Sequence, residues 1–372
     1  MASQMLMKDG LNDRAIGRIS GAFKSLYADF PEQRFQENCL DGLEELELKQ
    51  RIQHIITVLH QCLPTDFKKT AKLLLKLKTV WDYGDANDPL RGFAAWAVTD
   101  YVAEHGLHHP QKSLQVLEYL TDMFSSEFAI RPFIIHHYDI SYNQLLAWAG
   151  HKDEHIRRLA SEGCRPRLPW GIRLQQFCKD PQPLVAILEK LNNDSSEYVR
   201  RSVANNLNDI AKDHPEIVIN LCRKWSIGAS PETQWVIKHA TRTLVKAGHP
   251  EVFALLGYTK NPKLRLDSLS VNKPGIKLGE AISFDLALSS ESNKAQKLVI
   301  DYAVHHVKAN GKTTAKVFKL KTLNVAGGES VTLSKTQMFK PITTRKYYAG
   351  THTIEVLVNG VGLGRVDFNL QL

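Results

Sequence analysis

The sequence lacks any long apolar segment. None of its 372 positions belongs to a run of about 18 uncharged apolar residues, which excludes a transmembrane helix by composition. The first residues, "MASQMLMKDGLNDR", also lack the apolar stretch of a secretory signal. These two absences predict a protein of the cytoplasm.

Cysteine is scarce, and the motifs of several enzyme classes are missing. The five cysteines all precede residue 223 and form no C-x-x-C pair, so we expect free thiols and neither a disulfide framework nor a zinc ribbon. The adjacent histidine pairs, such as His108–His109, have no accompanying set of ligands. There is no Walker loop, no G-x-G-x-x-G after a strand and no G-x-S-x-G. No metal and no cofactor are therefore expected.

Positive charge is concentrated near the C-terminus. From Lys263 onward, 16 Lys and Arg residues face 8 Asp and Glu residues, a net charge of +8, while the preceding 262 residues carry +1. A basic module favours a polyanionic partner such as nucleic acid, although solubility alone also explains such a bias.

The hydrophobic pattern changes at the same place. From about Glu32 to Leu256 the chain reads as amphipathic helices with short breaks, and after "GYTKNPK" it alternates with period two. About seven strand candidates in roughly 110 residues, with "ANGK" and "VNGVG" as hairpin signals, favour an immunoglobulin-like β-sandwich. We predict a helical domain over 1–260 and a sandwich over 261–372.

The helical part contains an internal repeat. "HIRRLASEGCRP" (155–166), "YVRRSVANNLND" (198–209) and "WVIKHATRTLVK" (235–246) align with spacings of 43 and 37 residues, which is typical of HEAT-like α-solenoids. In the second unit, a buried stripe is predicted at helical spacing. Its members are Val199, Val203, Leu207 and Ile210.

A second stripe of the same helices is polar and mostly cationic. A cation recurs at one position of each unit, as Arg158, Arg201 and Lys238. Stacked repeats place equivalent positions in a row, so these cations are predicted to line a groove for phosphates. Further members of the stripe are Arg165, Arg242 and Lys246. The alternative is that each arginine only satisfies loop carbonyls or a neighbouring acid.

Two acids, Glu162 and Asp209, fall on or beside this stripe. A carboxylate there weakens phosphate binding, so it either holds an arginine in place or interacts with something positive in the ligand. Arg158 and Glu162 have the i, i+4 spacing of a common structural ion pair.

These segments resemble a known family. "SSEFAIRPF" (125–133), "HIRRLASEGCRPRLPW" (155–170) and "YVRRSVANNLNDIAKDHPE" (198–216) are similar to the AlkC-type DNA glycosylases, bacterial HEAT-like repair enzymes whose longer members carry an immunoglobulin-like module. The resemblance implies excision of 3-methyladenine and 3-methylcytosine from double-stranded DNA, without base flipping and without further strand cleavage, on the bacterial nucleoid. Motif matching places the active-site acids at Glu127, Glu162 and Asp209, with Trp170 beside the lesion.

The chemistry of the reaction suits those residue types. Alkylation at a ring nitrogen makes the base cationic and a good leaving group, so positive charge develops on the deoxyribose. A carboxylate stabilises that charge and positions water, and the face of Trp170 attracts the same cation. Which acid is indispensable stays open, and "LPWG" could also hold Trp170 against the next helix as a structural anchor.

The sandwich adds a second candidate surface for DNA. Lys308, Lys312 and Lys316 surround the "ANGK" hairpin, where they would clasp DNA or merely protect a sheet edge. A groove and a clasp on one chain suggest a working monomer. The rival interpretation is a HEAT scaffold without catalysis that binds nucleic acid or an acidic protein through its cations.

Overall fold

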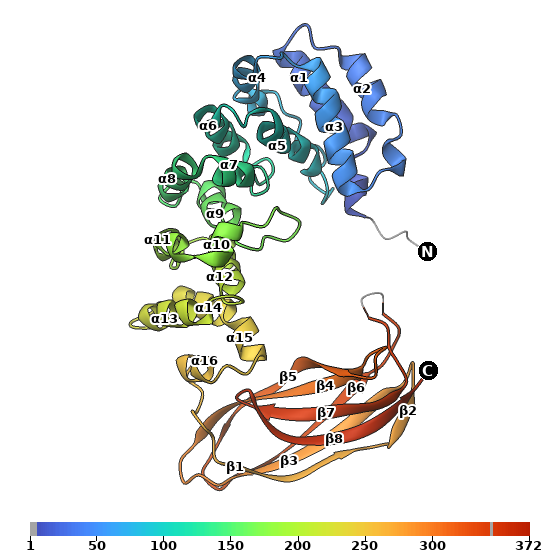
Figure 1. Ribbon diagram of the computed structural model, residues 1–372, viewed down its shortest axis with the longest axis vertical. Coiled ribbons are helices and arrows are strands. Elements are labelled where there is room, and N and C mark those ends of the chain that lie inside the picture. Colours follow the sequence, from blue (N-terminus) through green and yellow to red (C-terminus); the bar gives the residue numbers. More distant parts are fainter. Residues whose placement is uncertain (1–5, 343–344) are drawn as a thin grey trace. The chain divides into compact units, whose positions relative to one another are not determined.

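Helices fill the chain as far as Leu255, and strands follow from Leu264, in the predicted order (Figure 1). The computed structural model describes residues 6–342 and 345–372. The predicted fold class, HEAT-like helices followed by an immunoglobulin-like sandwich, is confirmed. Within the described ranges, no helix combines the length and apolar character that crossing a membrane requires.

The helical part consists of short helices joined by tight connections. Their bounds are α1 Asp13–Leu26, α2 Glu32–Leu40, α3 Leu48–Cys62, α4 Phe67–Leu74, α5 Phe93–His105, α6 Pro110–Leu120, α7 Ile130–His136, α8 Tyr138–Trp148, α9 Glu154–Gly163, α10 Gln175–Lys179, α11 Gln182–Leu191, α12 Glu197–Ile210, α13 Pro215–Trp225, α14 Pro231–Ala240, α15 Arg242–Lys246 and α16 Pro250–Leu255. Proline opens α6, α13 and α16 at the first helical position, where its missing N–H is not needed.

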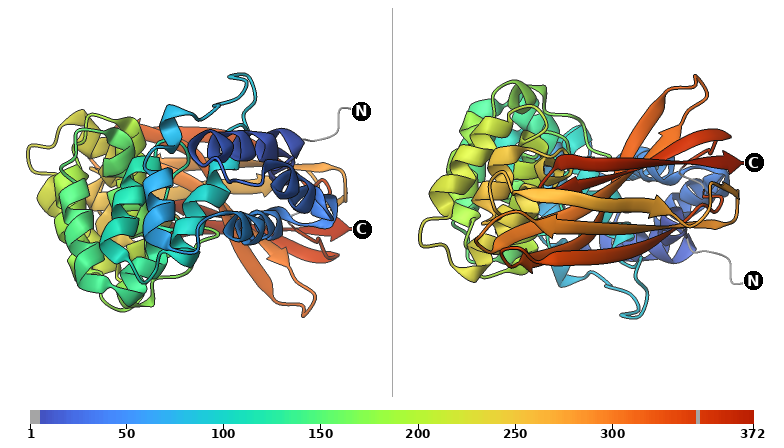
Figure 2. Two further views of the ribbon diagram at one scale, coloured as in Figure 1. Left: turned by 90° about the horizontal axis from the view of Figure 1, so that it is seen from above. Right: turned by 90° about the horizontal axis from the view of Figure 1, so that it is seen from below.

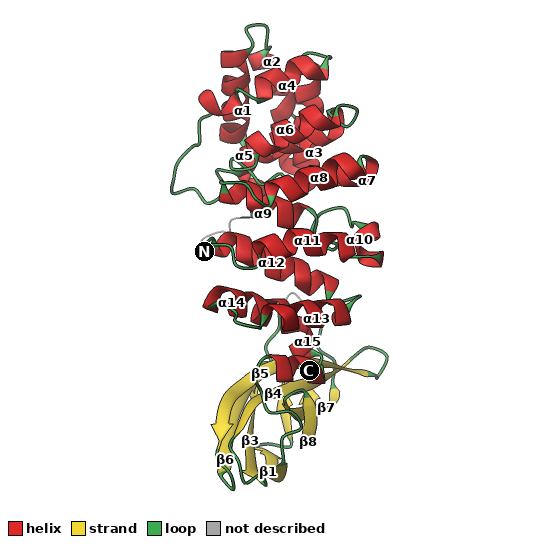
Figure 3. Ribbon diagram, turned by 90° about the vertical axis from the view of Figure 1, so that its left-hand side faces the viewer, coloured by secondary structure: helices red, strands yellow, loops and turns green. Residues whose placement is uncertain are grey.

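The three predicted repeat units are α9, α12 and the pair α14–α15, and Figure 3 shows α9, α12 and α14 in successive layers. The predicted stripe of α12 is confirmed, since Val199, Val203, Leu207 and Ile210 are each at most 2% exposed. Between layers, the buried Asn206 amide donates to the Ser161 carbonyl oxygen at 2.8 Å. Apolar faces therefore hold the layers together, and this hydrogen bond fixes how α12 lies on α9.

The strands form two sheets with a shared apolar core. The sheets have the orders β1-β3-β6 and β2-β8-β7-β4-β5. The strand bounds are β1 Leu264–Val271, β2 Gly275–Lys277, β3 Ala281–Ser290, β4 Gln296–Val307, β5 Thr313–Val325, β6 Ser330–Met338, β7 Gly350–Val358 and β8 Val361–Gln371. Phe284, Tyr302 and Phe368 are among the side chains buried between the sheets. Alternating inward residues thus build the sandwich, as period two predicts.

Both predicted hairpins are present. Asn359 and Gly360, at φ 46° and 81°, join β7 to β8 in the left-handed conformation that an Asn-Gly turn supplies. The β4–β5 hairpin turns at Gly311 (φ 73°) and projects beyond the rest of its sheet (Figure 2). The sequence missed β2, because its three residues are too few to show an alternating pattern.

The compact units of the molecule are not simply the helices and the strands. One unit comprises the residues up to Asp213 together with Ser230–Ala240. The other comprises His214–Ala229 and Thr241–Leu372. The last two helices belong with the sandwich because a Cβ on Gly360 would lie 2.3 Å from the Gly248 Cα, and Asn359 donates to the Thr259 carbonyl oxygen at 2.8 Å. The change from helix to strand and the division into units are therefore separate features.

Candidate active site

The loop that follows α9 carries Trp170. Helix α9 stops at Gly163, where a Cβ would lie 2.6 Å from the Ile130 Cγ2, and Pro166 prevents the helix from continuing. Trp170 has φ 63°, a conformation that bulky residues rarely adopt, and its side chain is 56% exposed. Trp170 therefore lies outside the core, and the loop is visible in green beside α10 in Figure 1.

Two cations hold this loop from outside it. Arg131, fully buried on α7, donates from Nη1 to the Gly163 carbonyl oxygen at 2.9 Å and from Nε to the Ile172 carbonyl oxygen. Burial lowers the pKa of Arg131 to about 10, which still leaves it charged at neutral pH. Lys49 of α3 donates to the Trp170 carbonyl oxygen. The sequence analysis gave neither residue a role, since each acts on a segment far along the chain.

The three predicted acids come together in one line of alternating charges. Arg158 donates from Nη1 to Glu127 Oε2 at 2.7 Å and lies 3.7 Å from Glu162. Arg165 donates from Nη1 to Glu162 Oε1 at 2.6 Å and from Nε to Asp209 Oδ2 at 2.8 Å. The order is therefore Glu127, Arg158, Glu162, Arg165 and Asp209, which we call the acid line.

Burial makes this alternation necessary. Asp209 and Glu162 are only 2% and 4% exposed. Burying such an acid without a cationic partner would destabilise the folded protein. Burial works against the charged form of Arg165, but Glu162 and Asp209 outweigh it, and the pKa of Arg165 is raised. The pKa of Arg158 is raised in the same way, with burial opposed by Glu127 and Glu162. Both guanidiniums are thus fixed cations.

Glu127 is the most exposed acid of the acid line. Its side chain is 14% exposed, against 6% for Glu162 and 2% for Asp209. Ser125 donates to Glu127 Oε2 at 2.8 Å and so orients the carboxylate. Tyr198 lies with its ring 4.5 Å from the Arg158 Cζ, a contact that sequence reasoning did not foresee.

The predicted DNA-binding cations fall into two groups. Arg158 and Arg165 are largely buried and paired with the acids, whereas Arg201 is exposed and pairs with Glu197 on its own helix. Equal positions in the repeat therefore do not mean equal exposure, because Glu127, Glu162 and Asp209 pair with Arg158 and Arg165, whereas Arg201 pairs with Glu197 at the surface. Lys238, Lys246, Lys308, Lys312 and Lys316 are exposed, and Arg242 is partly exposed. Their role in DNA binding stays a prediction.

Comparison with known proteins assigns the chain to a family. Residues 265–372 match the model of the C-terminal Ig-like domain of the uncharacterised protein YhaZ. Uncharacterized protein YhaZ of Bacillus subtilis (strain 168) is 39% identical over 365 residues, covering 98% of this chain and 99% of that protein. Pseudomonas fluorescens alkylpurine DNA glycosylase AlkC, solved bound to DNA containing an abasic site analog, is 38% identical to this chain. The structural match covers 99% of this chain and 100% of that chain, with a TM-score of 0.90. The chain belongs to the AlkC family.

Beside Trp170, this AlkC-family chain has a pocket of about 320 Å³ between α3, α5 and the α9–α10 loop. Asp100 lines it, with Oδ2 accepting from Trp96 Nε1 at 2.9 Å and with Oδ1 buried and without a hydrogen-bond partner. Burial raises the pKa of Asp100 to about 7. Trp96 itself is only 2% exposed, and no sequence pattern pointed to Asp100.

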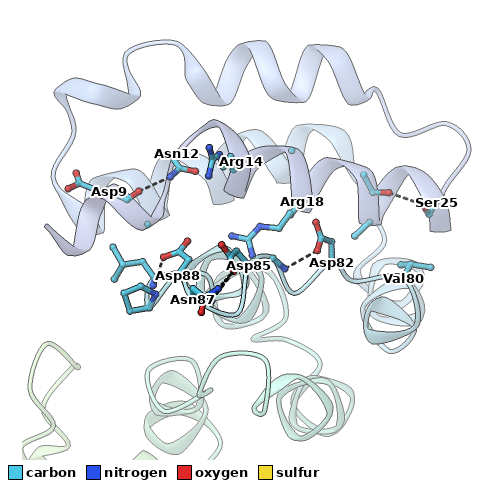
Figure 4. Close-up of a pocket in the computed structure, with 17 residues that line it drawn as sticks. Asp9, Asn12, Arg14, Arg18, Ser25, Val80, Asp82, Asp85, Asn87 and Asp88 are labelled. Atoms are coloured by element: carbon cyan, nitrogen blue, oxygen red, sulfur yellow. Dashed lines mark hydrogen bonds between the residues drawn. The ribbon is translucent and has the colours of Figure 1, made fainter. Parts of the chain in front are cut away.

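A wider cavity of about 940 Å³ lies between α1 and the loop before α5 (Figure 4). Its carboxylates are occupied by their own turns. Asp82 accepts from the Gly84 N–H at 2.8 Å, Asp85 from the Asn87 N–H at 2.9 Å and Asp88 from the Leu90 N–H at 2.8 Å. They shape the loop, and among the described residues no group of His, Cys, Asp and Glu has a metal-binding arrangement.

We expect Arg165→Met to lower the free energy of unfolding in urea by about 2 kcal/mol or more, because it leaves Glu162 and Asp209 buried with fewer cations. Arg158 and Lys212 still partner them, so the loss should stay below the about 3–5 kcal/mol of an isolated buried pair. The control is Arg201→Met, an exposed pair worth about 1 kcal/mol or less. Equal losses in the two variants would contradict the acid line as a structural unit.

Asp100→Asn tests the burial of an unpartnered carboxyl. The folded-state pKa of about 7 exceeds the ordinary 3.8, so wild type should lose stability relative to the variant as pH rises between these values. From pH 5 to pH 8, the stability of the variant relative to wild type should increase by about 1–3 kcal/mol, measured by urea unfolding at both pH values. An unchanged difference would show that Asp100 ionises in the folded protein as easily as in water.

Proposed function

We propose that this protein is a DNA repair glycosylase that hydrolyses the N-glycosidic bond of cationic alkylated bases, 3-methyladenine and 3-methylcytosine, and leaves an abasic site. The observation that carries the proposal is the acid line, which gathers three carboxylates in a chain of the AlkC family, with the exposed Trp170 on the loop that follows helix α9 and its Glu162. It acts as a monomer, in the cytoplasm of a bacterium, on double-stranded DNA.

The carboxylates match the charge that the reaction creates. As the bond to a cationic base breaks, positive charge moves to the sugar, so a fixed carboxylate lowers the energy of the transition state. Glu127 has the largest exposed fraction of the three acids, and Ser125 orients it, which suits contact with the sugar or with the attacking water. Asp209 and Glu162, which are more deeply buried, add negative electrostatic potential without contacting the sugar. Trp170 presents an aromatic face to the same cation.

In this proposal, Arg158 and Arg165 mainly pair with the acids and contribute less to DNA binding. Paired with carboxylates, they hold the acids in position, and their own charge is largely neutralised at the place where a cationic sugar forms. The phosphate contacts of the helical part are assigned to Arg201, Lys238, Arg242 and Lys246. The lesion stays in the base stack until the bond breaks, because the acids and Trp170 approach it from the groove.

The test is release of labelled 3-methyladenine from alkylated duplex DNA by wild type, Asp209→Asn and Glu162→Gln. At least one variant should lose excision by about 100-fold or more, with duplex binding kept or strengthened because a negative charge has gone. Asp213→Asn is the matched control, since Asp213 pairs with Arg167 outside the acid line. A binding scaffold without catalysis would release no base in any of these proteins.

The sandwich supplies a second DNA contact at its projecting hairpin. Lys308, Lys312 and Lys316 are exposed there, and like charges held close together bind best to a row of phosphates. Replacing all three with alanine should reduce the slope of log binding constant against log salt by about 2–3 and leave the rate of excision at saturating DNA unchanged.

The matched control for the hairpin replaces Lys263, Lys294 and Lys335, three exposed lysines elsewhere on the sandwich, with alanine. Binding is measured by fluorescence anisotropy across a salt series. If the two triple variants gave the same slope, the hairpin would hold no special position on DNA, and net charge alone would explain the effect.

A further inference from the structure

The pocket beside Trp170 contains an acceptor that nothing in the fold uses. Asp100 Oδ1 is buried and has no hydrogen-bond partner, while Trp96 Nε1 occupies the other carboxyl oxygen and fixes its direction. A buried polar atom without a partner costs free energy, and such atoms are few in folded proteins. Asp100 lines the pocket, so a donor supplied by a ligand there would satisfy Oδ1 after a small shift of the side chains that cover it.

The walls of the pocket are largely aromatic and aliphatic, with Lys49, Gln53 and Glu104 as further polar lining residues. Trp96 stacks on Phe128 with ring centroids 5.1 Å apart and on Phe124 at 4.9 Å. Ile52 and Ile56 of α3 face the same space, and Trp170 and Ile172 lie at its rim on the loop. At about 320 Å³ the volume is at the lower end of ligand pockets, enough for a single fused-ring heterocycle and too small for a nucleotide with its sugar and phosphate enclosed.

We propose that this pocket is a product site, which binds the methylated nucleobase after its release, with Asp100 accepting a hydrogen bond from an N–H edge of the ring. The inference rests on the proposed function. In that reaction, the water oxygen bonds to C1′ of the sugar, the water gives one proton to a carboxylate of the acid line and from there to solvent, and the C1′–N bond breaks. The base leaves with the bonding electron pair, so it enters the pocket uncharged. An uncharged ring suits an apolar wall better than the cationic lesion does.

The pocket is next to the chemistry. Phe128 and Ala129, which line it, follow directly after Glu127, and Trp170 belongs both to the pocket and to the candidate active site. The Lys49 ammonium, held on the Trp170 carbonyl oxygen, lies 5.7 Å from the Phe128 ring centroid and reduces the attraction of Asp100 for a cation. A released base therefore has a short path from the sugar to Asp100.

The first experiment measures binding of free 3-methyladenine by titration calorimetry. In Asp100→Asn the remaining oxygen is needed by Trp96 Nε1, so an amide N–H faces the pocket in place of an acceptor. Ala103→Leu, on α5, fills the same pocket without touching that hydrogen bond. Both variants should bind at least tenfold more weakly than wild type. Asp85→Asn, the same chemical change in the cavity of Figure 4, should bind as wild type does.

Wild-type affinity in both pocket variants would overturn the inference. Thermal unfolding of each variant accompanies the titrations, and if Asp100→Asn does not fold, Ala103→Leu decides. A second titration uses a duplex with 3-deaza-3-methyladenine, an uncharged analogue that stays attached to its sugar. Its binding should be the same for wild type and Ala103→Leu. A tenfold loss would mean that the base enters the pocket while still attached, which contradicts a product site.

Excision is assayed with the same preparations, so the two proposals fail separately. If wild type excises 3-methyladenine but binds the free base no better than Asp100→Asn, the product site is wrong and the glycosylase stands. If the free base binds in a way that depends on Asp100 and no base is excised, the glycosylase is wrong and the pocket is a base-binding site of another activity.

Discussion

The structure of the candidate site depends on one constraint: carboxylates that must be charged are buried in a protein of positive net charge. Asp209 and Glu162 are almost fully covered, and each is stable there because a guanidinium lies within hydrogen-bond distance. The alternation of acids and arginines keeps the acid line near electrical neutrality while the residues from Lys263 onward carry +8. The positive charge that no acid balances therefore lies in the C-terminal part of the chain, far in sequence from the acid line.

The same constraint explains why the loop after α9 is held so firmly. Its backbone turns through an unfavourable conformation at Trp170, and such conformations persist where the surroundings fix them. Arg131 fixes both ends of the turn, because it contacts the last residue of α9 and the Ile172 carbonyl oxygen. Helix α9 bears Glu162, so one buried arginine sets the relative position of an acid and of the aromatic ring. Arrangement of the site thus depends on contacts outside the site.

Periodicity predicted the parts of the fold that depend on neighbouring residues. The buried stripe of α12, the long strands and both hairpins follow from local spacing and turn chemistry. Spacing also predicted the ion pair between Arg158 and Glu162, which is present at 3.7 Å, although Arg165 lies closer to Glu162. The link from Arg165 to Asp209 joins residues 44 positions apart, and that from Arg131 to Ile172 spans 41. No local pattern encodes such contacts. The repeat alignment placed Glu162 and Asp209 on one stripe, and only the resemblance to a family added Glu127 to them.

The helical unit contains two kinds of buried carboxyl group. Glu162 and Asp209 are buried among arginines that balance their charge, although Glu162 Oε2 also has no hydrogen-bond partner. Asp100 is buried among Trp96, Phe128 and isoleucines, with one oxygen unused, and burial raises its pKa to about 7. A residue that only shaped the fold would do so better as asparagine or leucine at this place. An acid kept where it weakens the fold is better explained by a ligand that uses it, and the position beside Trp170 indicates a ligand of the same reaction.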